Sequence, residues 1–238
     1  MTHDLLRRDA KGEGTFSRVL ENIRRLQKAN VEFNILCVVN SVVAENADAV
    51  LDCLCEFDYL QFIPCLDNLD GTTQPHSLTT ETYSVFLEKA FARYQKAFTT
   101  KRRLSIRAFD NWVAMLLGMP PENCAMRGVC SPGFLVESTG DVYPCDFYAL
   151  DEWKLGNIRK HSLRQLHRMP QAKDFEEISL PVPDRCRTCP WYALCRNGCR
   201  RERDPKTGLY RFCLNMKSFF SAHIEDLNSI AQYIRSHE

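Results

Sequence analysis

The sequence lacks the features that mark membrane-spanning, secreted and strongly charged proteins. It contains no run of eighteen apolar residues, and about that many are needed to cross a bilayer. Its N-terminus, Met1 to Arg8, has no apolar signal core. Thirty-one basic residues nearly balance thirty acidic ones, for a net charge of +1. This balance gives no support to a nucleic-acid or membrane partner.

Repeats, low-complexity tracts and clustered histidines are also absent. None of the six histidines has metal-ligand spacing to another. The sequence therefore predicts a cytoplasmic globular protein whose thiols stay reduced. Clustered cysteines in that compartment favour metal over disulfides. Cysteine is what the chain has in plenty, with twelve in 238 residues.

Eight of these cysteines fall within one segment of about ninety residues. They are Cys124, Cys130, Cys145, Cys186, Cys189, Cys195, Cys199 and Cys213. Eight soft ligands suffice for two four-ligand sites. Structural zinc ribbons usually use two separated cysteine pairs, whereas here the ligands crowd one loop and Pro190 follows Cys189, as in some ferredoxins. Spacing alone favours iron–sulfur clusters, with zinc as the alternative and disulfides last.

The first quarter of the chain predicts alternating helix and strand. Thr15 is a predicted N-cap for a helix, and residues 31–40 (VEFNILCVVN) are a continuous apolar run typical of a strand covered on both faces. A helix over 44–57 and a strand over 59–66 follow. This β-α-β order predicts parallel strands with a right-handed crossover. Two strands are too few for a stable sheet, so the segment resembles the end of a longer α/β domain.

The rest of the chain predicts helices, a hairpin and a domain boundary. Thr79 or Thr80 is expected to cap a long helix, and Pro120-Pro121 is interpreted as the boundary between domains 1–119 and 120–238. Turn residues 138–141 predict a hairpin that would bring Cys130 and Cys145 together. Further helices are predicted over 108–117, 163–169 and 215–235.

At this point a family resemblance becomes specific. The string Cys130-x9-Gly140-x4-Cys145, Cys186-x2-Cys189-x5-Cys195-x3-Cys199 and Cys213 resembles the seven-cysteine SPASM domain of radical S-adenosylmethionine enzymes. Cys124 supplies an eighth ligand, as in the anaerobic sulfatase-maturating enzymes. Further strings similar to those enzymes are His3-Asp4-x-x-Arg7, Gly12-x-Gly14-Thr15-Phe16, VEFNILCVVN, Gln61 to Asp67, Cys145-Asp146 and Leu155 to Ile158.

The resemblance implies a fold and two cofactors. The fold would be α/β, the end of a partial parallel β/α barrel, followed by a small α+β iron–sulfur domain with a hairpin and a C-terminal helix. One auxiliary 4Fe–4S cluster would take Cys124, Cys130, Cys145 and Cys199, and the other Cys186, Cys189, Cys195 and Cys213. Full cysteinyl ligation suits electron transfer. Trp191 and Tyr192 are expected to pack around the clusters.

The resemblance also implies an activity. In the family, a radical derived from S-adenosylmethionine oxidises a cysteine or serine of a sulfatase polypeptide to Cα-formylglycine, with ferredoxin or flavodoxin as reductant. Asp146 matches the proposed general base, although the residues alone favour a turn role for it. Arg7, Asn34, Asn40 and Phe62 are candidate cofactor contacts, with surface or strand-core roles as the alternatives.

One departure from the family is serious. No Cys-x3-Cys-x2-Cys triplet is present, so the third 4Fe–4S cluster and S-adenosylmethionine would belong only to the complete enzyme. We therefore expect that the sequence starts inside the catalytic domain and that residues 1–66 expose apolar side chains. The competing hypotheses are a non-catalytic module, either an iron–sulfur electron carrier or a zinc protein, and a SPASM maturase of another peptide.

Overall fold

The computed structural model describes residues 2–69 and 72–237. It divides into two compact units, residues 1–113 with 225–238, and residues 114–224. The predicted boundary at 119/120 therefore falls inside the second unit, and the chain's last residues belong to the first. The reason lies in helix α11 (Cys213–Arg235), where Tyr233 packs edge-on against Phe98 with ring centroids 5.1 Å apart.

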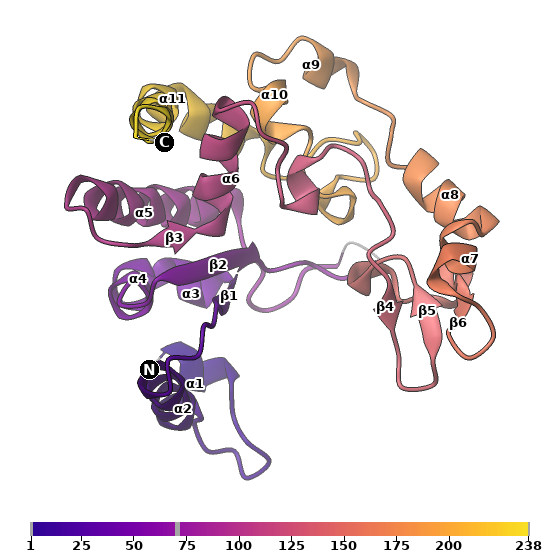
Figure 1. The fold of residues 1–238 in the computed structure, drawn as a ribbon, viewed down its shortest axis with the longest axis horizontal. Coiled ribbons are helices and arrows are strands. Elements are labelled where there is room, and N and C mark those ends of the chain that lie inside the picture. The colour runs from indigo at the N-terminus through magenta and orange to yellow at the C-terminus, as the bar shows by residue number, and fades with distance from the viewer. Residues whose placement is uncertain (1, 70–71, 238) are drawn as a thin grey trace. The chain divides into compact units, whose positions relative to one another are not determined.

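The first unit is built on a parallel sheet. Its strands β1 (Ile35–Val39), β2 (Tyr59–Pro64) and β3 (Ser105–Ile106) are hydrogen-bonded in the order β1-β2-β3. Helices α3 (Ser41–Glu45), α4 (Ala47–Leu54) and α5 (Thr80–Thr99) accompany the sheet, and α6 (Arg107–Leu116) follows β3 (Figure 1). The predicted parallel β-α-β unit is confirmed. The predicted helix 44–57 is divided at Asn46, and β3 was not predicted.

The core of this unit lies between the sheet and α5. Phe86 and Phe91 of α5 are fully buried, and Phe86 packs edge-on against Phe62 of β2 at 5.0 Å. Thr79 caps α5 in a capping box with Thr82, as the sequence predicted. Burying the rings between helix and sheet is what holds β1 and β2 in place.

The other face of β1 is not covered. Along this strand burial alternates, and Leu36 and Val38 are 59% and 41% exposed. The expectation that both strand faces are buried is therefore wrong for this chain, because the helices cover one face only. Helix α2 (Phe16–Lys28) likewise buries none of its described residues. The expected exposure of apolar side chains within residues 1–66 is confirmed.

The start of α2 also differs from the prediction. Thr15 precedes the helix, but its hydroxyl donates to the Arg7 carbonyl at 2.9 Å instead of capping. Asp4 of α1 (Thr2–Leu6) takes the capping role, since its carboxylate accepts from the Phe16 N–H at 2.8 Å. This hydrogen bond is the main reason that the pKa of Asp4 is lowered. Because Asp4 is twelve residues from the helix start in sequence, no local pattern could predict this cap.

The second unit contains a small antiparallel sheet. Strands β4 (Leu135–Val136), β5 (Asp141–Tyr143) and β6 (Gly156–Asn157) pair in that order, which confirms the predicted hairpin. Gly140 turns the hairpin at φ +86°, where an added Cβ would lie 3.0 Å from the Asn157 side chain. Helices α7 (Leu163–His167) and α8 (Pro170–Glu177) follow β6. Val142, Leu155, Leu166 and Ala172 form their shared core.

Short helical turns carry the remaining functional residues. The helices are α9 (Asp184–Arg187) and α10 (Tyr192–Cys195), and the 3-10 turns are η1 (Cys124–Met126), η2 (Asp146–Tyr148), η3 (Asp151–Trp153) and η4 (Arg200–Glu202). The predicted C-terminal helix is confirmed as α11 and begins two residues early, at Cys213 instead of Asn215. Four of the eight cysteines, Cys124, Cys145, Cys195 and Cys199, therefore lie at or directly before an end of a short turn.

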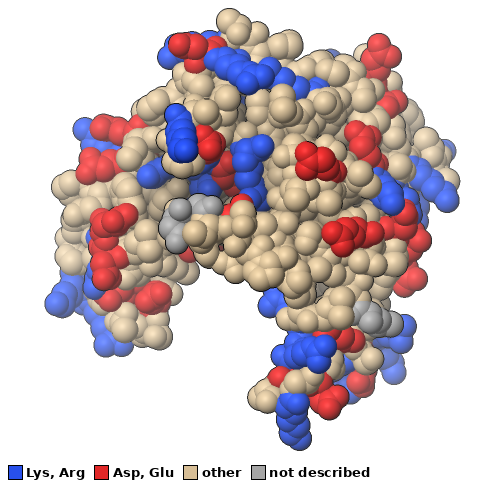
Figure 2. Space-filling view, turned by 180° about the vertical axis from the view of Figure 1, so that it is seen from behind, with Lys and Arg blue, Asp and Glu red and all other residues tan. Residues whose placement is uncertain are grey.

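Two surface properties agree with the composition. In the described part of the chain, no helix is both long and apolar enough to cross a membrane. Figure 2 shows blue basic and red acidic side chains interspersed over the face in view. That face therefore carries no extended field of one sign.

Candidate metal centre

Four of the predicted ligands line one cavity. Cys186, Cys189, Cys195 and Cys213 all border one small pocket. The same pocket is lined by Trp191 and Tyr192, as expected from the sequence. The ring of Trp191 packs on Phe220 at 6.0 Å, which anchors this wall in the core of the second unit. Four thiols around one partly apolar cavity suit a cluster with cysteine ligands.

The other four cysteines, Cys124, Cys130, Cys145 and Cys199, form the first set in chain order, and the four that line the cavity form the second set. Burial is the main cause that raises the pKa of Cys130, Cys145 and Cys199, and the nearby Cys124 raises each of them further. Cys130 also raises the pKa of Cys199. In the second set, the pKa of Cys195 is raised mainly by burial and further by Cys213, Cys186 and Cys189. In each case, the cysteine that raises the pKa belongs to the same set as the thiol whose pKa it raises. Among the described residues, no three Cys, His, Asp or Glu side chains converge closely enough to hold a single metal ion.

A left-handed turn separates the two sets. Arg196, Asn197 and Gly198 have φ values of +48°, +66° and +56°, a conformation that costs non-glycine residues about 1–3 kcal/mol each. Gly198 is required there, because an added Cβ would lie 2.6 Å from the Tyr210 ring. The turn reverses the chain between Cys195 and Cys199. It thereby lets two ligands four residues apart belong to different sets.

Hydrogen bonds compensate for the strain in this turn. The buried Asn197 accepts from the Tyr210 N–H at 2.8 Å and donates to the Gly208 carbonyl at 2.9 Å. The Cys186 thiol also lies 3.7 Å from the Asn197 side-chain oxygen. Arg203 donates to the carbonyls of Asn197 and Gly198. Buried and satisfied polar groups of this kind fix one conformation.

The same arginine reaches the first set through Ser179. Arg203 donates to the Ser179 carbonyl at 2.9 Å. The fully buried Ser179 hydroxyl accepts from the Cys130 N–H at 2.9 Å and donates to the Glu176 carbonyl at 2.6 Å. Cys130 is thus tied to the turn between Cys195 and Cys199. One hydrogen-bonded frame holds ligands of both sets.

Burial opposes ionisation of the thiols. It raises the pKa of Cys195 to about 11 and that of Cys199 to about 12, although a backbone N–H lowers each of them in part. The pKa of Cys145 is raised to about 12, chiefly by burial and further by Asp146. Metal ligation requires thiolates. Only a strongly Lewis-acidic partner would displace these protons near neutral pH.

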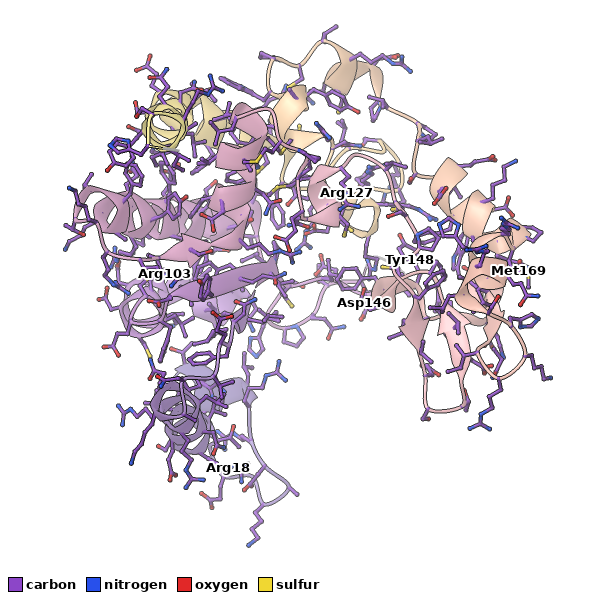
Figure 3. The ribbon with its side chains drawn as sticks, viewed as in Figure 1. Arg18, Arg103, Arg127, Asp146, Tyr148 and Met169 are labelled. Carbon is purple, nitrogen blue, oxygen red and sulfur yellow. The ribbon has the colours of Figure 1, made fainter. Side chains whose placement is uncertain are left out.

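Asp146 lies directly beside a predicted ligand. It opens η2, is exposed, and its carboxylate accepts a weak hydrogen bond from the Cys145 thiol at 3.3 Å. Figure 3 shows Asp146 and Tyr148 on this turn, next to the small antiparallel sheet. The position gives an exposed carboxylate that is adjacent to a thiol of the first set.

The four predicted cofactor contacts all lie in the first unit. Arg7 and Asn34 are exposed, and Asn34 and Asn40 flank opposite ends of β1. The Asn40 side chain caps α3 by accepting from the Val43 N–H at 3.0 Å. Phe62 lies in β2 and packs on Phe86. Each residue thus has a structural partner or a surface position, and a cofactor role for them remains a prediction.

Comparison with known proteins identifies a matched domain and related sequences. A family model described as SPASM, an iron–sulfur cluster-binding domain, matches residues 128–190. Over 97% of its length the chain is 41% identical to the cysteine-type anaerobic sulfatase-maturating enzyme of Clostridium novyi. Residues 128–190 thus match the SPASM domain, and the chain is related to the anaerobic sulfatase-maturating enzymes. It spans 64% of the length of that relative.

Other relatives extend the comparison. The serine-type enzyme of Bacteroides thetaiotaomicron is 27% identical over 92% of this chain, which spans 58% of that enzyme. The solved structure of native anSMEcpe with bound AdoMet and the Cp18Cys peptide superposes with a TM-score of 0.92 at 38% identity. That match covers 98% of this chain and 66% of that one. The predicted fold class is therefore confirmed.

Several residues of the SPASM region were not singled out from the sequence. Ser179 and Arg203 join the ligand loops, and Arg200 lies among aromatic rings beside Cys199. The Asn-Gly pair at 197–198 is a turn signal and could have indicated the reversal between Cys195 and Cys199. The others leave no local pattern, because their partners are distant in sequence.

Proposed function

We propose that this chain is the auxiliary-cluster part of an enzyme that oxidises a sulfatase residue to Cα-formylglycine. The observation that carries the proposal is that Cys186, Cys189, Cys195 and Cys213 line one pocket, while a left-handed turn separates Cys195 from Cys199. The relatives, at 38–41% identity, are named cysteine-type anaerobic sulfatase-maturating enzymes. The names of these relatives and the positions of the cysteines therefore support the same function.

Each set would hold one 4Fe–4S cluster. Cys124, Cys130, Cys145 and Cys199 would ligate the first, and Cys186, Cys189, Cys195 and Cys213 the second. When bound, such clusters supply one-electron transfer. Four cysteines each leave no open iron, so neither set is built to bind a substrate directly. The hydrogen-bonded frame of Ser179 and Arg203 would keep the two sets in fixed register.

Asp146 would act as the general base. Oxidation of a cysteine side chain to a thioaldehyde requires loss of a Cβ hydrogen atom, an electron and the thiol proton. An exposed carboxylate 3.3 Å from the Cys145 thiol can accept that last proton beside the first cluster's ligands. A base positioned within hydrogen-bond reach is the basic requirement of this catalysis.

Sequence identity favours cysteine as the target residue. The chain is 41% and 39% identical to two cysteine-type enzymes and 27% identical to a serine-type enzyme. A site that hydrogen-bonds a hydroxyl discriminates against its analogues, so the two types need different contacts. We therefore assign a sulfatase cysteine as the substrate.

S-adenosylmethionine and a third 4Fe–4S cluster would belong to the complete enzyme only. Solved relatives are named with bound AdoMet. Arg7, Asn34, Asn40 and Phe62 are proposed to contribute to that cofactor's surroundings. Asn34, which is exposed, fits this role better than Asn40, whose side-chain oxygen already caps α3.

A chimera tests this function. The 238 residues would replace the matching region of the cysteine-type enzyme of Clostridium perfringens, to which the chain is 39% identical. We expect the chimera to form formylglycine on a sulfatase-derived cysteine peptide, detected by mass spectrometry. A chimera that binds iron and cleaves S-adenosylmethionine but leaves the peptide unchanged would contradict the proposed substrate.

The reductant is proposed to be an acidic electron carrier such as ferredoxin or flavodoxin. Between Glu152 and Asp174 the sequence has six Lys and Arg residues and no acidic residue: Lys154, Arg159, Lys160, Arg164, Arg168 and Lys173. Arg164 and Arg168 line an open groove together with Phe134 and Leu163. Phe134 follows Gly133, whose N–H donates to the carbonyl of Pro144 at 2.7 Å, next to Cys145. A partner in this groove would lie near the first ligand set.

Reversing these charges should slow electron delivery. We expect Arg164→Glu with Arg168→Glu to reduce the rate of cluster reduction by reduced flavodoxin roughly tenfold at low salt. The difference should shrink as salt screens the charges. Stopped-flow absorbance measures the rate. Arg18→Glu with Lys28→Glu on α2 is the matched control, and dithionite should reduce all variants equally. Equal rates with flavodoxin would exclude this groove as the docking surface.

A further inference from the structure

An aromatic cage surrounds Arg200 beside the first ligand set. Its guanidinium carbon lies 4.7 Å from the Tyr148 ring centroid, 5.1 Å from that of Trp153 and 5.3 Å from that of Phe175. The three rings pack edge to face on one another, with centroids 5.3–6.3 Å apart. They come from η2, η3 and α8, and Arg200 comes from η4. Four separate segments thus converge on one positive charge.

The cage does not neutralise this charge. Within the described residues, the Nη1 atom of Arg200 is buried without a hydrogen-bond partner. Ring faces attract a cation, by about 0.5–2 kcal/mol per contact, but they carry no net charge. Arginine also stays protonated in proteins. Arg200 is partly buried, and removing a cation from water is costly unless a negative charge lies nearby, which the cage does not supply.

Two ligands of the first set adjoin the segments that form the cage. Arg200 directly follows Cys199 in the chain. Tyr148, one wall of the cage, ends η2, and its N–H donates to the carbonyl of Cys145 at 3.0 Å. The guanidinium therefore lies within electrostatic reach of both the aromatic wall and two thiols of this set.

We propose that Arg200 is a positioning residue whose fixed charge raises the reduction potential of the cluster held by Cys124, Cys130, Cys145 and Cys199. The inference rests on the proposed cluster assignment. A cluster gains one negative charge on reduction, so a nearby buried cation stabilises the reduced form more than the oxidised form. The aromatic cage fixes the distance and excludes water. Both effects strengthen the interaction relative to a surface arginine.

The test compares potentials within one molecule. We expect Arg200→Gln to lower one of the two cluster potentials and leave the other unchanged, with full iron content. The reduced-to-oxidised ratio of the affected cluster should fall about tenfold at the wild-type midpoint, equivalent to about 59 mV for a one-electron couple. Redox titration followed by electron paramagnetic resonance measures both clusters. Arg200→Lys keeps the charge and should retain the wild-type potential.

Arg187→Gln is the matched control. Arg187 follows a ligand of the other set, Cys186, but its side chain is 66% exposed, so its removal should leave both potentials unchanged. Unchanged potentials in an iron-replete Arg200→Gln protein would overturn the inference. Should that variant lose iron, Arg200→Lys decides alone, because a lowered potential in a variant that keeps the charge also overturns it. Wild-type protein without two clusters would instead contradict the proposed function itself.

Discussion

Replacing Cys195 with alanine is expected to remove one iron–sulfur cluster, and replacing Cys199 is expected to remove the other. The two residues are four positions apart, but the left-handed turn at Arg196 to Gly198 separates them. After anaerobic reconstitution the wild-type chain should hold about eight irons and eight sulfides. Each variant should lose about half of the iron, measured with sulfide content and electron paramagnetic resonance.

The remaining signal in each variant identifies the lost cluster. Cys186→Ala and Cys213→Ala should leave the same spectrum as Cys195→Ala, whereas Cys124→Ala and Cys145→Ala should match Cys199→Ala. Cys53→Ala, on α4 of the first unit, is the control and should retain all iron. The assignment is wrong if the Cys195 and Cys199 variants lose the same signal. Bound zinc without sulfide would exclude clusters altogether.

Asp146→Asn should abolish most of the formylglycine formation in the chimera. Asn has nearly the shape of Asp but cannot accept a proton near neutral pH. Loss of a general base costs about 10²–10⁴-fold in rate. Formylglycine is measured by mass spectrometry on the cysteine peptide, and S-adenosylmethionine cleavage by chromatography. Cleavage should continue, because Asp146 acts after the radical forms.

A neighbouring aspartate supplies the control. Asp151 is also exposed and also opens a 3-10 turn, but it is no neighbour of a cysteine in sequence. Asp151→Asn should keep the parent chimera's rate, and both variants should keep full iron content. If Asp146→Asn reacts as fast as Asp151→Asn, then Asp146 is only a turn residue. That is the role which the residues alone favoured.

Local sequence patterns predicted several features of the fold correctly. The hairpin at 138–141, the Thr79 cap and the C-terminal helix each rest on several adjacent residues that agree. The two-residue strands β3 and β6 were not predicted, because two residues have no periodicity. Helix α8 was also not predicted, although Pro170 at its first turn is a starting signal. The cap of α2 by Asp4 depends on a contact across a loop.

The sequence by itself determined that this chain has eight clustered thiols in a SPASM-like register, on a fold with a short parallel sheet. Cysteine number, spacing and the hairpin are local properties and can be read directly. Only the tertiary structure decided which thiols are neighbours and which charges face them. Cys195 and Cys199 diverge because three consecutive residues have positive φ. Arg200 meets Tyr148, Trp153 and Phe175 because folding brings four distant segments together. Such side-chain directions depend on backbone angles and long-range packing, which sequence spacing does not specify.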